Sequence, residues 1–194
     1  MRRLVLVRHA QVRLDPELPP QRWELTDEGL ADAQRLAASP VFGRVEAVVT
    51  SPEPKARATA EPIAAAAGVE LQVERDLREA GRGAAPVDDH AAFVARVDAW
   101  LGGDPTPGWE ERDVAAARIV GSIGRVLDRT SGDLVVVSHG TVLSLYLAWL
   151  RGQERVDLRE WEATPLPAVA VVDPAARTIV VPWQGAEGGT KRPR

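Results

Sequence analysis

Two of the three histidines in this 194-residue chain directly follow its two most apolar short runs. Residues 3–8 form an apolar run before His9, and residues 134–138 form another before His139. Runs of this length and composition are typical of strands that are buried on both faces of a parallel sheet. Since ligands bind where the carboxyl ends of such strands meet, we expect both imidazoles to lie at that edge.

Helical patterns alternate with these apolar runs along the chain. Thr26 is expected to cap one helix, and another is expected to begin near Pro54 and to be kinked or interrupted at Pro62. The alternation predicts an α/β fold: a three-layer α/β/α sandwich around a mainly parallel sheet, with a small helical cap. Residues 168–172 and 178–181 predict a hairpin that adds an antiparallel edge. The other expected strands are residues 3–8, 45–50, 69–73 and 134–138, and the later helices are residues 110–129 and 141–150.

Segments rich in helix and strand breakers interrupt this pattern without dividing it into two domains. Residues 81–89 and 102–108 are rich in Gly and Pro, and an apolar helical pattern lies between them. We therefore expect one domain over residues 1–184, with a cap inserted at about residues 81–109. The polar, Gly-rich segment 185–194 is expected to be a disordered tail.

The composition excludes several classes of protein. The chain has no cysteine, which rules out thiol nucleophiles, iron–sulfur clusters and disulfides. Its formal net charge of −4 argues against nucleic acid as a partner. The best candidate for a membrane span, residues 141–150, has about half of the roughly 20 residues required, and no targeting signal is visible. We expect a cytoplasmic protein with no membrane partner.

Two imidazoles beside Arg8, with no thiol, suggest three kinds of chemistry. A metal site is disfavoured because no His-x-x-x-His pair or Asp-rich cluster accompanies the histidines, so no metal or cofactor is expected. A serine triad is disfavoured because the chain lacks a Gly-x-Ser-x-Gly elbow. Phosphoryl transfer to a neutral imidazole fits better. Arg8 supplies a permanent bidentate cation, and Gly140 and Thr141 open a helix whose backbone N–H groups can face an anion.

Five short motifs follow one another between residue 4 and about residue 149. They are Leu-Val-Arg8-His9-Ala10, Leu25-Thr26-x-x-Gly29, Ser51-Pro52-x-x-Lys55-Ala56-x-x-Thr59-Ala60, Leu77-x-Glu79 and Val136-Val137-Ser138-His139-Gly140. In this order and at these intervals they resemble the histidine phosphatase superfamily, the phosphoglycerate-mutase-like proteins. The ordered series, rather than any single motif, carries the resemblance.

The resemblance implies a role for each matching residue. His9 is then the nucleophile that carries the phosphoryl group, and Arg8, Lys55 and His139 hold its oxygens. Glu79 is then the acid that protonates the leaving oxygen and afterwards activates the water. Because such an acid must be protonated when the ester bond breaks, we expect burial or the substrate phosphate to raise the pKa of Glu79. Residues 108–110 and 118 loosely match a further Gly-Glu motif and its following arginine.

Three positions depart from the pattern of the family. Ala10 stands where the family has Gly, which adds one methyl group. Lys55 stands where the family has Arg, and it supplies a point charge rather than a planar fork, unless Arg57 reaches the site in its place. Only Lys55 and Lys191 are lysines among the 24 basic residues, which favours a local reason for Lys55. Asp15 stands where the mutase branch has Asn, and we assign this carboxylate no binding role because it would repel phosphate.

Three functions fit the motifs. The first is a metal-independent phosphatase that hydrolyses a small phosphate monoester through a phosphohistidine on His9. The second is a phosphoglycerate-type mutase, which is disfavoured because mutases carry longer insertions that exclude water and this chain has little spare length. The third is a catalytically weak module that binds a phosphorylated ligand, supported only by Ala10 and Lys55. The motifs carry no signal for one particular substrate or oligomeric state.

Overall fold

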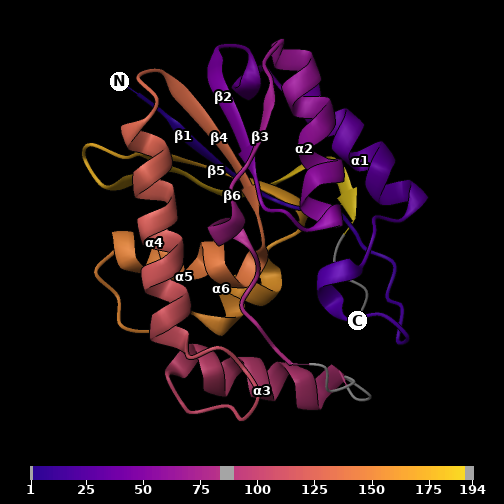
Figure 1. Ribbon diagram of the computed structural model, residues 1–194, viewed down its shortest axis with the longest axis vertical. Coiled ribbons are helices and arrows are strands. Elements are labelled where there is room, and N and C mark those ends of the chain that lie inside the picture. The colour runs from indigo at the N-terminus through magenta and orange to yellow at the C-terminus, as the bar shows by residue number, and fades with distance from the viewer. Residues whose placement is uncertain (1, 84–89, 191–194) are drawn as a thin grey trace.

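The computed structural model describes residues 2–83 and 90–190, and its strands form one six-stranded sheet (Figure 1). The strands are β1 (Leu4–Arg8), β2 (Val45–Thr50), β3 (Leu71–Val73), β4 (Asp133–Ser138), β5 (Leu166–Asp173) and β6 (Thr178–Thr190). They lie in the order β3-β2-β4-β1-β5-β6. The first four strands pair in parallel, and β5 and β6 run antiparallel at one edge. The predicted mainly parallel sheet with an antiparallel edge is confirmed.

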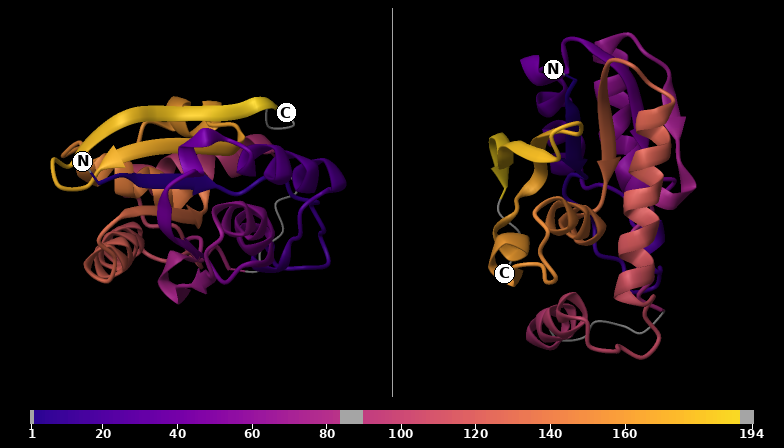
Figure 2. Two further views of the ribbon diagram at one scale, coloured as in Figure 1. Left: turned by 90° about the horizontal axis from the view of Figure 1, so that it is seen from above. Right: turned by 90° about the vertical axis from the view of Figure 1, so that its left-hand side faces the viewer.

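Helices cover both faces of this sheet. In chain order they are α1 (Asp27–Ala37), α2 (Pro54–Ala67), α3 (His90–Gly102), α4 (Arg112–Asp128), α5 (Gly140–Leu150) and α6 (Leu158–Ala163), with short 3-10 turns η1 (Pro20–Arg22), η2 (Pro40–Phe42) and η3 (Arg75–Leu77). α1 and α2 lie on one face, and α4 and α5 lie on the other (Figures 1 and 2). The predicted α/β/α layering is therefore confirmed. α3 lies beyond the end of the sheet (Figure 1).

Alternation along β1 connects the sheet to both helical layers. Leu4 and Leu6 belong to a core that also contains residues of α4 and α5, whereas Val5 and Val7 belong to a second core with residues of α1 and α2. All four side chains are fully buried. Successive side chains of a strand face opposite sides of the sheet, so a strand that is covered on both faces needs an unbroken apolar run. The polar residues Arg8 and His9 therefore come only where this apolar run ends, at the carboxyl end of β1.

Two helices differ from the prediction. α2 continues without interruption past Pro62, so the expected interruption there is wrong. Ile63 and Ala64 pack in the core against the sheet, and this packing holds the helix although proline removes one hydrogen bond. α6 was not predicted. It begins where the Asp157 side chain accepts a hydrogen bond from the backbone N–H of Arg159.

The C-terminal hairpin is longer than the apolar pattern indicates. β6 continues to Thr190, whereas a disordered tail was expected from Gly185. Gly185 pairs with Ala168 of β5 and Thr190 pairs with Leu166, so backbone pairing extends the strand where its side chains carry no apolar pattern. Residues 191–194 lie outside the described part of the chain.

The expected cap contains α3, while residues 84–89 of the same segment lie outside the described residues. Trp100 and Leu101 of α3 are buried, and the Trp100 Nε1–H donates to the Glu110 carbonyl at 2.7 Å. These contacts attach α3 to the segment that leads into α4. Within residues 2–83 and 90–190, no helix is both long and apolar enough to cross a lipid bilayer.

Candidate active site

The carboxyl ends of β1 and β4 lie side by side and bring two histidines together. Arg8 at the end of β1 is in register with Ser138 at the end of β4. The residues that follow, His9 and His139, have ring centroids 5.3 Å apart with an angle of 62° between the ring planes. The expectation that both imidazoles share one edge of the sheet is confirmed.

His9 holds one ring nitrogen against its own backbone turn and leaves the other unprotonated. Its Nδ1 lies 2.7 Å from the carbonyl oxygen of Ala10. Because a carbonyl can only accept, Nδ1 carries the proton and Nε2 keeps its lone pair. Burial lowers the pKa of His9 well below its ordinary value, and His139, Lys55 and Arg8 lower this pKa further. His9 is therefore a neutral imidazole near pH 7.

His139 is fully buried and is held by the opposite nitrogen. Its Nε2 lies 2.7 Å from the Ser51 hydroxyl oxygen and 3.4 Å from Oε1 of Glu53. Its Nδ1 is buried and has no hydrogen-bond partner among the described residues. Burial lowers the pKa of His139 well below its ordinary value, and the charges of Lys55 and Arg82 lower this pKa further. Nδ1 is thus the ring nitrogen of His139 that no hydrogen-bond partner among the described residues occupies.

Arg8 lies across the strand ends, where Gly140 leaves it room. Its side chain is buried, and its Nη1–H donates to the Thr164 carbonyl at 2.6 Å. A Cβ atom on Gly140 would lie 2.8 Å from Nε and 2.9 Å from Cζ of Arg8. Any side chain at residue 140 would therefore push the guanidinium out of place. Gly140, which the sequence suggested as a phosphate-binding residue, has this steric role in the structure.

Lys55 lies in the first turn of α2 and is buried with its ammonium group in the site. Its Nζ donates to Oε2 of Glu53 at 2.5 Å and to the Pro20 carbonyl at 2.8 Å. Its charge acts on both histidines. Arg57 is exposed, so the structure places Lys55 and not Arg57 in the site. Glu53 was not singled out from the sequence, since a glutamate before a helix usually faces solvent.

Glu79 is surrounded by hydrogen-bond donors. Its carboxylate accepts from the N–H of Ala80 at 2.9 Å, lies 3.3 Å from Arg82 Nη2, and accepts from the first N–H groups of α5, Thr141 and Val142, at 3.3 Å each. Burial raises the pKa of Glu79, but Arg82 and the hydrogen-bond donors outweigh burial and hold this pKa below its ordinary value. The free protein thus differs from the expected raised pKa. The Thr141 N–H, expected to face the substrate, here binds Glu79.

A comparison of the chain with known protein families agrees with the motifs in the sequence. The histidine phosphatase superfamily (branch 1) matches the chain over residues 4–183. The chain belongs to this superfamily. The matched segment contains the histidine pair, Lys55 and Glu79, so the match covers the whole site described above. No curated protein matches the chain at a significant level.

Solved structures share the fold of this histidine phosphatase superfamily member. TTHB049 from Thermus thermophilus is 27% identical, with a TM-score of 0.65, over 92% of this chain and 97% of that one. YhfR from Bacillus stearothermophilus is 21% identical, with a TM-score of 0.74, over 93% and 96% of the two chains. A mycobacterial glucosyl-3-phosphoglycerate phosphatase is 21% identical, with a TM-score of 0.67, over 95% and 96%.

Two further motif residues shape the turn after His9 in this superfamily member. The Thr59 hydroxyl accepts from the N–H of Ala10 at 3.0 Å and donates to the Lys55 carbonyl at 2.7 Å. This hydroxyl therefore ties the turn to the helix that carries Lys55. A Cβ atom on Gly29 would lie only 2.3 Å from the Gln11 carbonyl oxygen, so the turn requires glycine there. Both residues belong to the quoted motifs, but the sequence did not indicate these contacts.

Arg118 of α4 fixes the segment that carries Glu79. Its Nη1–H groups donate to the carbonyls of Asp76 at 2.7 Å and Arg78 at 2.9 Å. Its other nitrogens donate to the Glu110 carboxylate at 2.9 and 2.8 Å. Glu110 and Arg118 belong to the segments that loosely match a family motif. In the structure, Glu110 holds Arg118, and Arg118 holds the backbone on both sides of Leu77.

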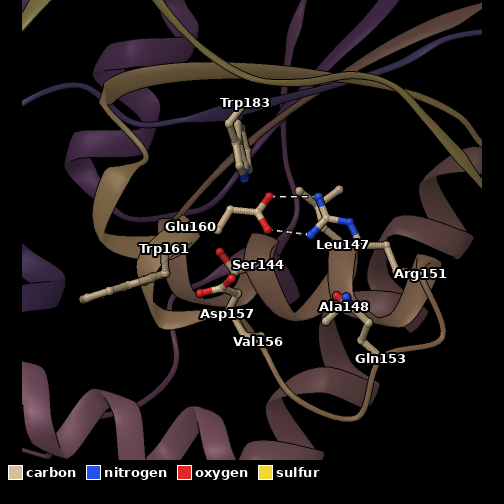
Figure 3. Close-up of a pocket in the computed structure, with 10 residues that line it drawn as sticks. All are labelled: Ser144, Leu147, Ala148, Arg151, Gln153, Val156, Asp157, Glu160, Trp161 and Trp183. Carbon is tan, nitrogen blue, oxygen red and sulfur yellow. Dashed lines mark hydrogen bonds and ion pairs between the residues drawn. The ribbon is translucent and has the colours of Figure 1, made fainter.

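The hollow drawn in Figure 3 contains none of the residues discussed as catalytic or phosphate-binding. It is lined by residues of α5, α6 and β6, and Arg151 pairs there with both carboxylate oxygens of Glu160 at 2.6 and 2.8 Å. Trp161, which also lines it, is a buried core residue. Across the described residues, no group of three or more His, Cys, Asp or Glu side chains could hold a metal ion.

Proposed function

We propose that this protein is a phosphatase that hydrolyses a small phosphate monoester through a phosphohistidine on His9, without a metal. The observation that carries the proposal is the hydrogen bond from His9 Nδ1 to the Ala10 carbonyl, because it leaves Nε2 as an unprotonated nucleophile. Arg8 and Lys55 lie close enough to this ring for their charges to act on it. Such cations stabilise the negative charge on a phosphoryl group in transfer.

In the first step, Nε2 of His9 forms a bond to phosphorus while the bond between phosphorus and the leaving oxygen breaks. The leaving oxygen takes a proton from Glu79, so an alcohol departs. Glu79 must first be protonated, and in the free protein Arg82 and neighbouring N–H groups oppose this. A bound phosphate brings negative charge next to the carboxylate, which favours its protonated form.

In the second step, a water molecule attacks the phosphohistidine. Glu79, now a carboxylate, takes a proton from this water as its oxygen bonds to phosphorus. The bond between phosphorus and nitrogen breaks, its electron pair returns to Nε2 of His9, and inorganic phosphate leaves. Glu79 is protonated again, and both residues are ready for another cycle.

The site supports an enzyme over a module that only binds. Lys55 was one of the two departures that favoured a weak binding module, but its ammonium group is buried and its charge acts on both histidines, which supports a phosphate-holding role. Ala10, the other departure, is fully buried, and its N–H and carbonyl both take part in the turn that orients His9. The added methyl group is therefore accommodated.

An assay with para-nitrophenyl phosphate tests the proposal. We expect equal amounts of para-nitrophenol and inorganic phosphate, and acid-labile phosphate on His9 after a rapid quench. A mutase would instead retain the phosphoryl group and pass it to a second alcohol such as a phosphoglycerate. Absence of turnover with retained phosphate binding would favour the binding module, and covalent phosphate on any other residue would contradict the mechanism.

A further inference from the structure

Glu53 immediately precedes α2, and its buried carboxylate joins three parts of the site. The side chain is 6% exposed. Its Oε2 accepts a hydrogen bond from Lys55 Nζ at 2.5 Å. Its Oε1 accepts from the backbone N–H of Glu79 at 2.8 Å and lies 3.4 Å from Nε2 of His139. The mechanism above gives this carboxylate no role.

A carboxylate at this place requires an explanation. Burial raises the pKa of Glu53 although the nearby Lys55 charge opposes this, so its ionised form is costly to keep. Its negative charge would also repel a bound phosphate. A buried carboxylate that is costly to ionise and that repels the substrate must contribute something else to the site. Its hydrogen bond with Lys55 is the contact that can do so.

The N–H donors of a lysine such as Lys55 have no direction fixed by the shape of the side chain, unlike those of an arginine. An ammonium group has three N–H donors on a flexible stem, whereas a guanidinium group presents a rigid planar fork. Glu53 and the Pro20 carbonyl take two of the three donors of Lys55. Since the ammonium group is tetrahedral, fixing two N–H bonds also fixes the direction of the third.

We propose that Glu53 is a positioning residue that directs the third N–H of Lys55 toward the phosphoryl oxygens. The inference rests on the proposed function, because it assumes that Lys55 holds the phosphoryl group. Orientation matters most in the transition state, where the contact must meet a defined oxygen. Loss of Glu53 removes this orientation but also removes a repelling charge. The proposal therefore separates two effects: binding of a transition-state analogue weakens, while binding of inorganic phosphate does not.

Calorimetric binding of orthovanadate and inorganic phosphate tests this separation without requiring turnover. Vanadate can form a five-coordinate complex that resembles the transition state. We expect Glu53→Gln to weaken vanadate binding about tenfold or more, and to change phosphate binding less than about threefold. In a Lys55→Met background, Glu53→Gln should change vanadate binding less than about threefold, because its target is gone. Glu61→Gln is the matched control, since Glu61 is an exposed glutamate of α2.

Each other outcome overturns a defined part of the argument. Additive losses in the double variant, or wild-type vanadate affinity in Glu53→Gln, would show that Glu53 does not act through Lys55. Equal loss of both ligands with a lower Tm would show a structural role alone. If Glu53→Gln does not fold, Glu53→Asp retains the charge at a changed distance and should show the same preferential loss of vanadate. Vanadate binding without ester hydrolysis would overturn the proposed function and with it the transition-state role of Glu53, whereas hydrolysis with wild-type vanadate affinity in Glu53→Gln would overturn the role of Glu53 alone.

Discussion

A histidine follows each of β1 and β4 at the same edge of the sheet, yet the two imidazoles are held in opposite ways. The Ala10 carbonyl holds Nδ1 of His9, whereas the Ser51 hydroxyl lies against Nε2 of His139. The nitrogen left over is therefore Nε2 in one ring and Nδ1 in the other. The sheet determines where both rings lie, and the oxygen atom beside each ring determines which nitrogen is left without a partner among the described residues.

Removal of each imidazole gives the largest expected effect and tests this difference directly. His9→Ala removes the nucleophile and should lower kcat by roughly 10⁴-fold or more. His139→Ala removes one stabilising group and should lower kcat by about 10²–10³-fold. Stopped-flow release of para-nitrophenol measures both, and circular dichroism checks that both variants remain folded. Equal losses, or covalent phosphate found on His139, would remove the distinction between the two strand ends.

Lys55 extends the comparison from the histidines to a cation whose charge acts on both rings. Lys55→Ala should lower kcat/KM by about 10²–10³-fold, since it removes a charged contact that is strongest in the transition state. Arg57→Ala is the control and should be silent, because Arg57 is exposed on the same helix. A silent Lys55→Ala together with an inactive Arg57→Ala would place the functional cation two residues along.

The buried neutral histidines also predict how stability depends on pH. The folded protein holds the pKa of His139 well below its ordinary value of 6.5, so only the unfolded chain takes up a proton as the pH falls below 6.5. The free energy of unfolding then decreases by up to about 1.4 kcal/mol per pH unit for this residue. Urea unfolding at pH 7.5 and pH 5.5 measures the change. His139→Asn should lose less stability over this interval than the wild type, and an equal loss would contradict a buried neutral ring.

A chelator should have the smallest effect. A metal ion shared by the two rings would make their roles alike, and would tie activity to that ion. Turnover should change less than about twofold in excess EDTA, because the proposed cations are side chains of the protein. Loss of activity on chelation, with recovery on adding a divalent ion, would contradict the separate roles of His9 and His139.

The layered fold was accessible from the sequence because each central strand is a continuous apolar run. Residues 4–7 and 134–137 need no tertiary information to be recognised as buried strands. β6 was predicted too short, since backbone pairing with β5 extends it over polar and glycine residues. α2 is not interrupted at Pro62, because its core packing outweighs the local penalty of a proline.

The sequence predicted only those parts of the site that local patterns mark. His9 and His139 were found because strand ends are visible in the sequence. Glu53, Arg82 and Thr164 each also contact a residue far away in the chain, such as Arg8, whose guanidinium donates to the Thr164 carbonyl at 2.6 Å. The lowered pKa of Glu79 depends in the same way on burial, Arg82 and the start of α5. No local pattern encodes such contacts.

The membership of β1 in both cores has a consequence for unfolding. Neither helical layer can separate from the sheet without exposing alternate side chains of this strand, Leu6 on one face and Val7 on the other. We therefore expect both layers to melt as one cooperative unit, and the amide hydrogens of β1 to exchange with solvent only when that unit opens. His9 is attached directly to the end of β1, and its N–H bonds to the Ser138 carbonyl at the end of β4. We accordingly expect thermal inactivation and global unfolding to share a single midpoint.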